Sequence, residues 1–84
     1  MRFYKKEIGK LFIFRWVDAY SEYGASLNNM IKNGLPIKTT TGWLDYFCQE
    51  YIIITTEKDT ATEDADRTMI PKGWVIEKTE VVDE

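Results

Sequence analysis

The segment that decides the fold is Thr41–Thr56, with the sequence TGWLDYFCQEYIIITT. Its second half, Tyr51–Thr56, is the richest run of β-branched residues in the chain and predicts a strand. Gly42, near its start, indicates a bend, a bulge or a close approach of two backbones. We therefore expect an antiparallel hairpin of two strands, Ile37–Leu44 and Tyr51–Thr56, joined by a turn over Asp45–Glu50.

Upstream of this hairpin, Lys10–Asp18 predicts a strand with apolar side chains on both faces. Phe12, Phe14 and Trp16 alternate onto one face, and Leu11, Ile13 and Val17 fall on the other. This pattern predicts burial on both sides for part of the strand, as in a sharply curved sheet. Met1–Glu7 reads either as a first strand or as a loose arm.

A short helix is predicted between the first two long strands. Ser26 suits the N-cap position, Leu27, Met30 and Ile31 follow at helical spacing, and Gly34 suits the end. So short a helix is not stable alone, so we expect it to pack on the sheet.

Downstream of the hairpin, the acidic segment Glu57–Arg67 predicts a mobile loop because it has five acids and no large apolar residue. A short fourth strand, Thr68–Ile70, follows. Pro and Gly positions in Ile70–Gly73 predict a type I turn, and Trp74–Val81 alternates as a fifth strand. The fold class expected is mainly β (α+β), with five strongly bent antiparallel strands forming a sheet or an SH3/Sm-like barrel.

Length and charge set limits on the partners. The 84 residues make one domain, residues 1–84, and the net charge is −3. Residues 1–38 carry +4 and residues 39–84 carry −7. The acidic total disfavours general nucleic-acid binding, because phosphate contacts need clustered Lys and Arg, although the basic N-terminal part keeps a local patch open.

The residue types exclude the common catalytic chemistries. The sequence has no histidine, which removes the commonest general base and metal ligand. Cys48 is the only cysteine and reads as a small hairpin filler, and the acidic segment lacks the spacing and glycine of a calcium loop. The glycines are scattered and form no phosphate-binding loop. We expect no enzyme activity, no cofactor and no metal.

No apolar run reaches the roughly 20 residues that span a bilayer, and the first residues do not read as a signal peptide. The single cysteine fits a reducing cytoplasm, which is the expected location, and no membrane partner is expected.

Aromatic and basic residues provide the candidate binding site. Tryptophan is enriched at protein interfaces, and three in this chain exceed what a small core requires. The opposing interpretation places these rings, and those of the aromatic and basic N-terminal strand, in the core. The candidate binding residues are Arg15, Trp16, Trp43, Tyr46, Lys72 and Trp74.

The order of short motifs resembles small open reading frames of bacteriophages and prophages. The motifs are Phe14–Asp18, Thr41–Leu44, Tyr51–Ile54 and Ile70–Ile76, with a helical insert and an acidic loop between them. The second half also resembles Sm-like proteins, in which a glycine-bent strand pairs with the next and a short turn joins the last two. That resemblance implies five curved antiparallel strands. The helix here follows the first strand, whereas in Sm proteins it precedes it.

Three functions stay open at this point. The phage resemblance implies an accessory protein that binds and inhibits a host bacterial protein, such as a defence component. An alternative is a binder that sequesters a small nucleotide signal, using Arg15, Lys72 and exposed rings. A nucleic-acid-binding Sm-like barrel is the third. The sequence also leaves open whether the chain forms a homo-oligomer.

Overall fold

Five antiparallel strands form one sheet in the computed structural model, which describes residues 1–21, 23–58 and 65–82. The strands are β1 Leu11–Val17, β2 Ile37–Phe47, β3 Tyr51–Lys58, β4 Ala65–Pro71 and β5 Val75–Glu80, in the spatial order β4-β3-β2-β1-β5. The helical segments are α1 Leu27–Asn33 and two 3-10 turns, η1 Lys5–Glu7 and η2 Lys72–Trp74. The predicted hairpin of adjacent antiparallel strands is confirmed as β2 and β3.

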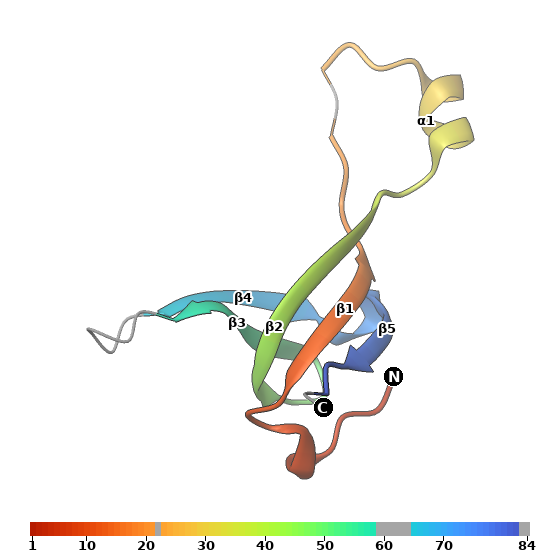
Figure 1. Ribbon diagram of the computed structural model, residues 1–84. Helices are drawn as coiled ribbons and strands as arrows, with labels where there is room; N and C mark the ends of the chain where they lie inside the picture. Colours follow the sequence, from red (N-terminus) through yellow and green to blue (C-terminus); the bar gives the residue numbers. More distant parts are fainter. Residues whose placement is uncertain (22, 59–64, 83–84) are drawn as a thin grey trace.

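β2 belongs to two ladders and approaches β3 closely at Gly42. Its residues up to Trp43 pair with β1, and those from Trp43 onward pair with β3. A Cβ added at Gly42 would lie 2.9 Å from the carbonyl oxygen of Thr55, so the backbones approach closely there. This confirms the predicted role of the glycine. Figure 1 shows the result: the β3–β4 hairpin crosses β1 and β2 at a steep angle.

The closed barrel expected from the sequence is not confirmed. β4 and β5 are the two edges of the sheet, and the sheet is open. Each edge strand pairs on one side only, β4 with β3 and β5 with β1. What the structure supports is therefore a strongly bent five-stranded antiparallel sheet with one helix.

The core lies on the inner face of the bent sheet. Phe12, Phe14 and Trp16 of β1 are buried there as predicted, together with residues of the other strands and the N-terminal segment. The opposite face of β1 departs from the prediction, because Ile13 and Arg15 are exposed there. In this small domain the bent sheet buries only its inner face, and the opposite face of β1 contacts solvent. The buried apolar residues outside β1 are Phe3, Leu44, Ile52, Ile54, Ile70 and Val75.

Helix α1 has the predicted ends but not the predicted packing. The Ser26 hydroxyl accepts a hydrogen bond from the N–H of Asn29 at 3.4 Å, and Gly34 ends the helix with a φ of 68°. No residue of α1 is buried. Figure 1 shows the helix on a long protrusion away from the sheet, so the expectation that it packs there is wrong.

Strand boundaries differ from the sequence prediction at three turns. The turn predicted over Asp45–Glu50 is shorter, because β2 continues to Phe47. The predicted acidic loop is shorter too: β3 continues to Lys58 and β4 begins at Ala65, since cross-strand pairing outweighs the polar composition. The rest of that loop, residues 59–64, lies outside the described residues. The type I turn was predicted at Ile70–Gly73. In the structure β4 continues to Pro71, and the 3-10 turn η2 follows it.

The N-terminal segment is neither a strand nor a loose arm. Phe3 is buried, with its ring centroid 6.5 Å from that of Phe14 and 6.0 Å from that of Phe47. The segment then forms η1 and enters β1, and the N–H of Gly9 donates to the carbonyl of Leu44 at 2.7 Å. It therefore covers one end of the core.

Candidate functional site

The most exposed apolar surface of the molecule is the connection between β1 and β2, here called the arm (residues 19–36). Leu27 and Ile31 of α1 are each 72% exposed, although both were expected to face the core. Aromatic and apolar side chains on either side of the helix are exposed as well. These are Tyr20, Tyr23 and Leu35. Compact monomers seldom expose so many large apolar side chains together, so the arm has the composition of a contact surface.

The base of the arm is a narrow neck where the β1–β2 ladder ends. Val17 and Ile37 are the last paired residues, and the N–H of Asp18 donates to the carbonyl of Pro36 at 3.0 Å. Asp18 also forms an ion pair with Lys38 at 2.8 Å. The hydrogen bond from Lys38 and the N–H of Ala19 lower the pKa of Asp18 below 3.8, and desolvation opposes them only partly.

A small apolar groove lies at this neck. Val17 at the end of β1, Asp18 and Ala19 at the start of the arm, Leu35 at its end, and Trp74 of η2 line a volume of about 230 Å³. A second hollow of about 150 Å³ adjoins residues of the arm itself. It is lined by Tyr20, Asn33, Gly34 and Pro36. The neck and η2 thus form a concave, largely apolar surface that continues onto the arm.

Among the predicted site residues, Trp74 is the one that lines this groove, and it is 38% exposed. Trp16 is 9% exposed and belongs to the core, as the opposing interpretation had it. Its indole N–H donates to the hydroxyl of Thr40 at 3.1 Å, and Lys38 Nζ lies 5.6 Å from its ring centroid. The Trp16 ring that faces Lys38 is therefore mostly buried.

The other predicted residues are dispersed. Arg15 lies on the exposed face of β1 and pairs with Glu77 at 3.1 Å. Lys72 is half-buried in η2, two residues before Trp74. Trp43 is half-buried at the bend of β2, and the Tyr46 ring centroid lies 6.1 Å from that of Tyr51 at the β2–β3 hairpin. These side chains do not line one shared pocket in the described part of the chain.

Tyr51 lies at the β2–β3 hairpin end, close to Cys48 and Tyr46. The Cys48 thiol, desolvation and Tyr46 raise the pKa of Tyr51 above its ordinary value of 10.0. Asp45, at a bulge of β2, accepts hydrogen bonds from the Thr55 hydroxyl and from Arg67. These contacts tie β2, β3 and β4 together and are structural.

Sequence reasoning missed the residues that make the arm a surface. Leu27 and Ile31 were expected to pack on the sheet, because an amphipathic helix normally faces the core of its own chain, and Leu35 was not singled out. The signal that could have found them was the long polar and aromatic connection Ala19–Tyr23, which gives the helix room to stand away from the sheet.

Over residues 1–21, 23–58 and 65–82, no three His, Cys, Asp or Glu side chains gather as a metal site. Nor does any helix in that part of the chain have the length and hydropathy needed to cross a membrane.

Comparison with protein-family models, with curated proteins and with solved structures finds no match for this chain. The resemblance to phage reading frames stays a prediction. The functional argument therefore rests on the arm, the groove at its base and the charges of the molecule.

Proposed function

We propose that this chain is a non-enzymatic accessory protein that binds another protein through the arm and the groove at its base. The observation that carries the proposal is the exposure of the large apolar side chains of the arm, from Tyr20 to Leu35. Tyrosine and other aromatic residues are enriched in the cores of protein interfaces, and charged residues are depleted there. The arm has this composition.

The charge of the arm indicates what kind of surface on a partner it fits. Residues 19–36 contain one lysine and one glutamate, so the arm has no net charge, although the chain carries −3. A neutral apolar protrusion offers little attraction to a polyanion or a polycation. The partner surface that fits is an apolar, uncharged groove on another protein, into which the arm inserts with Leu27 and Ile31 leading.

The resemblance to phage reading frames supports a protein of the host bacterium as the partner. In this proposal the chain acts by occupying the partner surface and blocking it, and a component of bacterial defence is the first partner class to test.

Two features support the finer assignment to an SH3/Sm-like architecture as part of the proposal. β2 is bent at a glycine and pairs with β3, and the single turn η2 joins β4 to β5. Both belong to the Sm-like resemblance. A small bent sheet of this kind supplies a rigid base from which a long connection can project.

The test begins with capture from bacterial lysate and continues with the identified partner in purified form. The arm variant replaces Leu27, Ile31 and Leu35 by serine. The control variant replaces Met69, Ile76 and Val82 by serine. These side chains are also exposed, but Met69 lies on β4, Ile76 on β5 and Val82 just after β5. We expect the arm variant to bind at least about tenfold more weakly than the control, since each leucine-sized contact contributes about 1.5–3 kcal/mol.

Two results would count against the proposal. One is the absence of any stoichiometric partner whose purified form binds. The other is a concentration-dependent dimer, measured by light scattering, that the arm variant abolishes. That result would make a second copy of this chain the occupant of the arm.

A further inference from the structure

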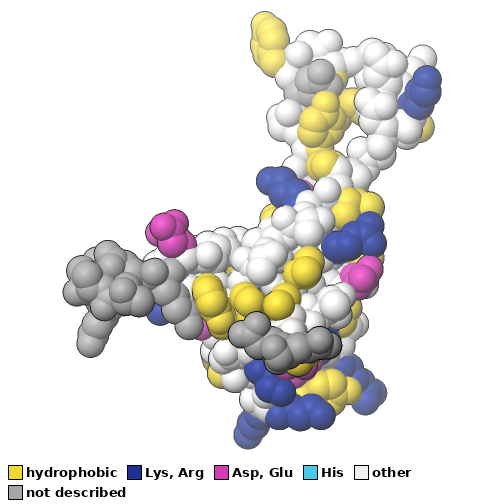
Figure 2. Space-filling model, viewed as in Figure 1, with side chains coloured by type: hydrophobic (Ala, Val, Ile, Leu, Met, Phe, Trp, Pro, Cys, Tyr) yellow, Lys and Arg dark blue, Asp and Glu magenta, His cyan; other side chains and the backbone are white. Residues whose placement is uncertain are grey.

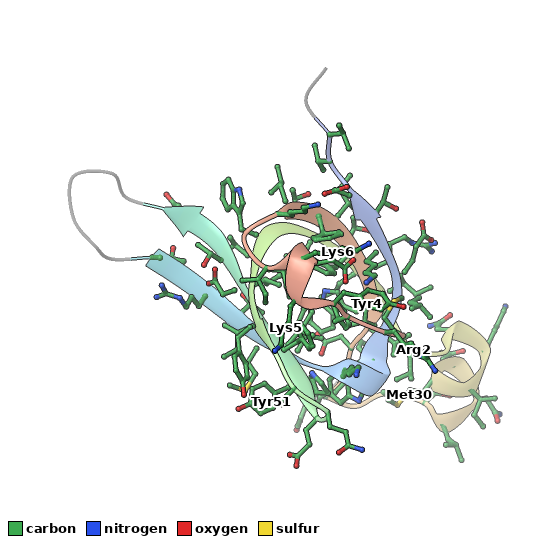
Figure 3. All side chains as sticks on the ribbon, turned by 90° about the horizontal axis from the view of Figure 1, so that it is seen from below. Arg2, Tyr4, Lys5, Lys6, Met30 and Tyr51 are labelled. Atoms are coloured by element: carbon green, nitrogen blue, oxygen red, sulfur yellow. The ribbon has the colours of Figure 1, made fainter. Side chains whose placement is uncertain are left out.

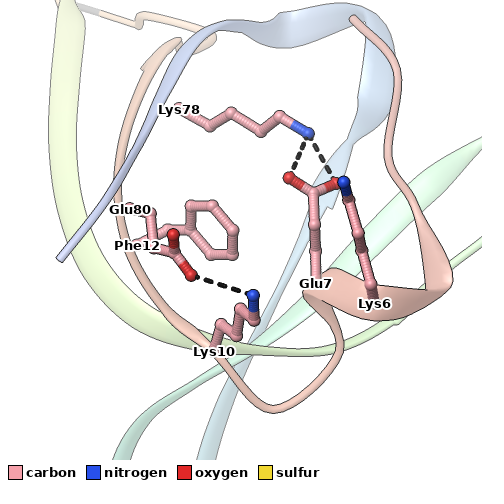
Figure 4. A pocket seen from close by; sticks show the side chains of 6 residues that line it. All are labelled: Lys6, Glu7, Lys10, Phe12, Lys78 and Glu80. Atoms are coloured by element: carbon pink, nitrogen blue, oxygen red, sulfur yellow. Dashed lines mark hydrogen bonds and ion pairs between the residues drawn. The ribbon is translucent and has the colours of Figure 1, made fainter. Parts of the chain in front are cut away.

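A second candidate site lies at the N-terminal turn, at the opposite end of the sheet from the arm. η1 and the ends of β1 and β5 surround a pocket of about 350 Å³, shown in Figure 4. This volume falls within the range of small-molecule sites. The pocket is lined by Lys6, Glu7, Lys10, Phe12, Lys78 and Glu80.

Both carboxylates of this pocket already have cationic partners. Glu7 binds Lys78 Nζ through its two oxygens, at 2.6 and 2.7 Å, and Glu80 pairs with Lys10 at 3.3 Å. The side chains of Lys78 and Glu7 are only 15% and 13% exposed. Lys78 Nζ also donates to the carbonyl of Arg2 at 2.6 Å. The Glu7–Lys78 pair therefore holds the N-terminal segment against β5.

The pair also presents η1 in a defined conformation. The N–H of Glu7 donates to the carbonyl of Tyr4 at 2.9 Å, and the N–H of Tyr4 donates to Glu7 Oε1 at 2.7 Å. This reciprocal cap closes the turn that carries Lys5 and Lys6. Fixing the backbone of this turn in advance lowers the entropic cost of binding a ligand there.

Several cations around the turn have no carboxylate partner among the residues that the structure describes. Arg2, Lys5 and Lys6 form no ion pair with any other described residue, and Lys6 Nζ lies 5.8 Å from the Tyr4 ring centroid. Figure 3 shows Tyr4, Lys5 and Lys6 on the turn with Arg2 beside them, and Figure 2 shows Lys and Arg side chains gathered at this end.

The charge at this end opposes that of the chain. Among the described residues, and with Lys10, Lys78, Glu7 and Glu80 included, this end carries five cations and two carboxylates, a net +3 in a protein of net −3. Such local polarity attracts anions to one end only.

We propose that this pocket binds a compact polyphosphate, either inorganic or the phosphate chain of a nucleotide. Lys6 and Lys10 contact the phosphate oxygens at the pocket, and Lys5 and Arg2 lie within the same positive field. The Tyr4 ring, 49% exposed, offers a face on which a base stacks. This site is separate from the arm, so it stands or fails independently of the proposed protein partner.

The first test is calorimetric titration with sodium tripolyphosphate at low ionic strength. Lys6→Gln removes a cation that forms no ion pair with another described residue, and it leaves both ion pairs of the pocket intact. Lys32→Gln on α1 is the matched control. We expect saturable binding that weakens at least about tenfold in Lys6→Gln and is unchanged in Lys32→Gln. Binding should also weaken as salt is added. No saturable binding, or equal losses in the two variants, would overturn the proposal.

ATP and adenosine distinguish the sources of the phosphate. Binding of ATP about fivefold or more tighter than tripolyphosphate, with the difference lost in Tyr4→Ala, assigns a nucleotide. Equal affinities assign inorganic polyphosphate. Adenosine binding as tightly as ATP would contradict the site, because it lacks phosphate. A thymidine oligonucleotide that outcompetes both ligands would replace the proposal with a nucleic-acid surface.

Discussion

Gly42 shows how much a single residue decides in this sheet. An added Cβ would lie 2.9 Å from the Thr55 carbonyl oxygen and 3.3 Å from Ile54 Cδ1, both in the neighbouring strand. Neither contact can be relieved by rotating an exposed side chain. The close approach of β2 to β3, at the point where β2 passes from the ladder with β1 to the ladder with β3, therefore depends on the missing side chain.

Gly42→Ala should lower the free energy of unfolding by about 1–3 kcal/mol, since overpacking forces backbone shifts. Gly73→Ala is the control, because an added Cβ there has no heavy atom within 4 Å. Thermal unfolding followed by circular dichroism measures both. Equal melting temperatures for the two variants would show that the close approach is not limiting.

Asp18 makes the neck of the arm sensitive to acid. Its pKa lies below 3.8 in the folded chain because Lys38 donates a hydrogen bond to it. A lowered pKa contributes stability that is complete above the unfolded value and is lost as pH falls through the folded value. The stability difference between the wild type and Asp18→Asn should therefore be constant above about pH 5 and shrink below 3.8. Denaturant melts across this range measure it, and a constant difference down to pH 2 would refute the linkage.

At the scale of elements, helix α1 contributes no buried side chain to the core of the sheet, so we expect the stability of the sheet to be nearly independent of it. Its capping residues are those of an ordinary helix, and its apolar side chains contribute no burial within this chain. Helices this short normally gain their stability from packing. A helix without such packing is held by its caps and the neck, and it is available for a partner.

Serine at Leu27 and Ile31 should therefore change the free energy of unfolding by less than about 0.5 kcal/mol, as surface substitutions do. Ile54→Ala, in the buried part of β3, should cost about 2–5 kcal/mol. Urea titration of both variants provides the comparison. A large loss from the helix substitutions would mean that α1 packs on the sheet after all.

At the scale of the whole molecule, the arm gives the chain an elongated shape. The radius of gyration is 15.3 Å, compared with about 12 Å for a compact domain of this length. The five-stranded sheet carries the core, and the arm adds length without adding burial. The two proposed binding regions lie at opposite ends of this long shape.

Replacing residues 20–35 by a turn about fourfold shorter should leave the sheet folded and raise its stability by about 1.2 kcal/mol, because the loop-closure entropy falls. The same variant should lose the proposed protein partner and keep tripolyphosphate binding. Denaturant unfolding measures the stability, and calorimetric titration with the purified partner and with tripolyphosphate measures the two binding reactions. A shortened chain that fails to fold would show that the arm is part of the folding unit.

Much of the local structure could be predicted from the sequence. Alternation placed the rings of Phe12, Phe14 and Trp16 on one face of β1, which is buried, although burial was expected on both faces; Ser26 and Gly34 marked both ends of α1. These features depend on neighbouring residues, through strand periodicity and capping. For the candidate site, Trp74 was predicted, whereas the arm residues and the turn with Lys6 were not assigned to it.

Only the tertiary structure decided where these elements lie relative to one another. The sequence by itself determined a mainly β chain, a glycine-bent hairpin and a capped helix, because strand alternation, turn residues and caps act within a few positions. It did not determine that the sheet stays open, that α1 stands away from it, or that Glu7 meets Lys78. Those outcomes depend on contacts between residues far apart in the chain, and no local pattern encodes which of several apolar faces is left uncovered.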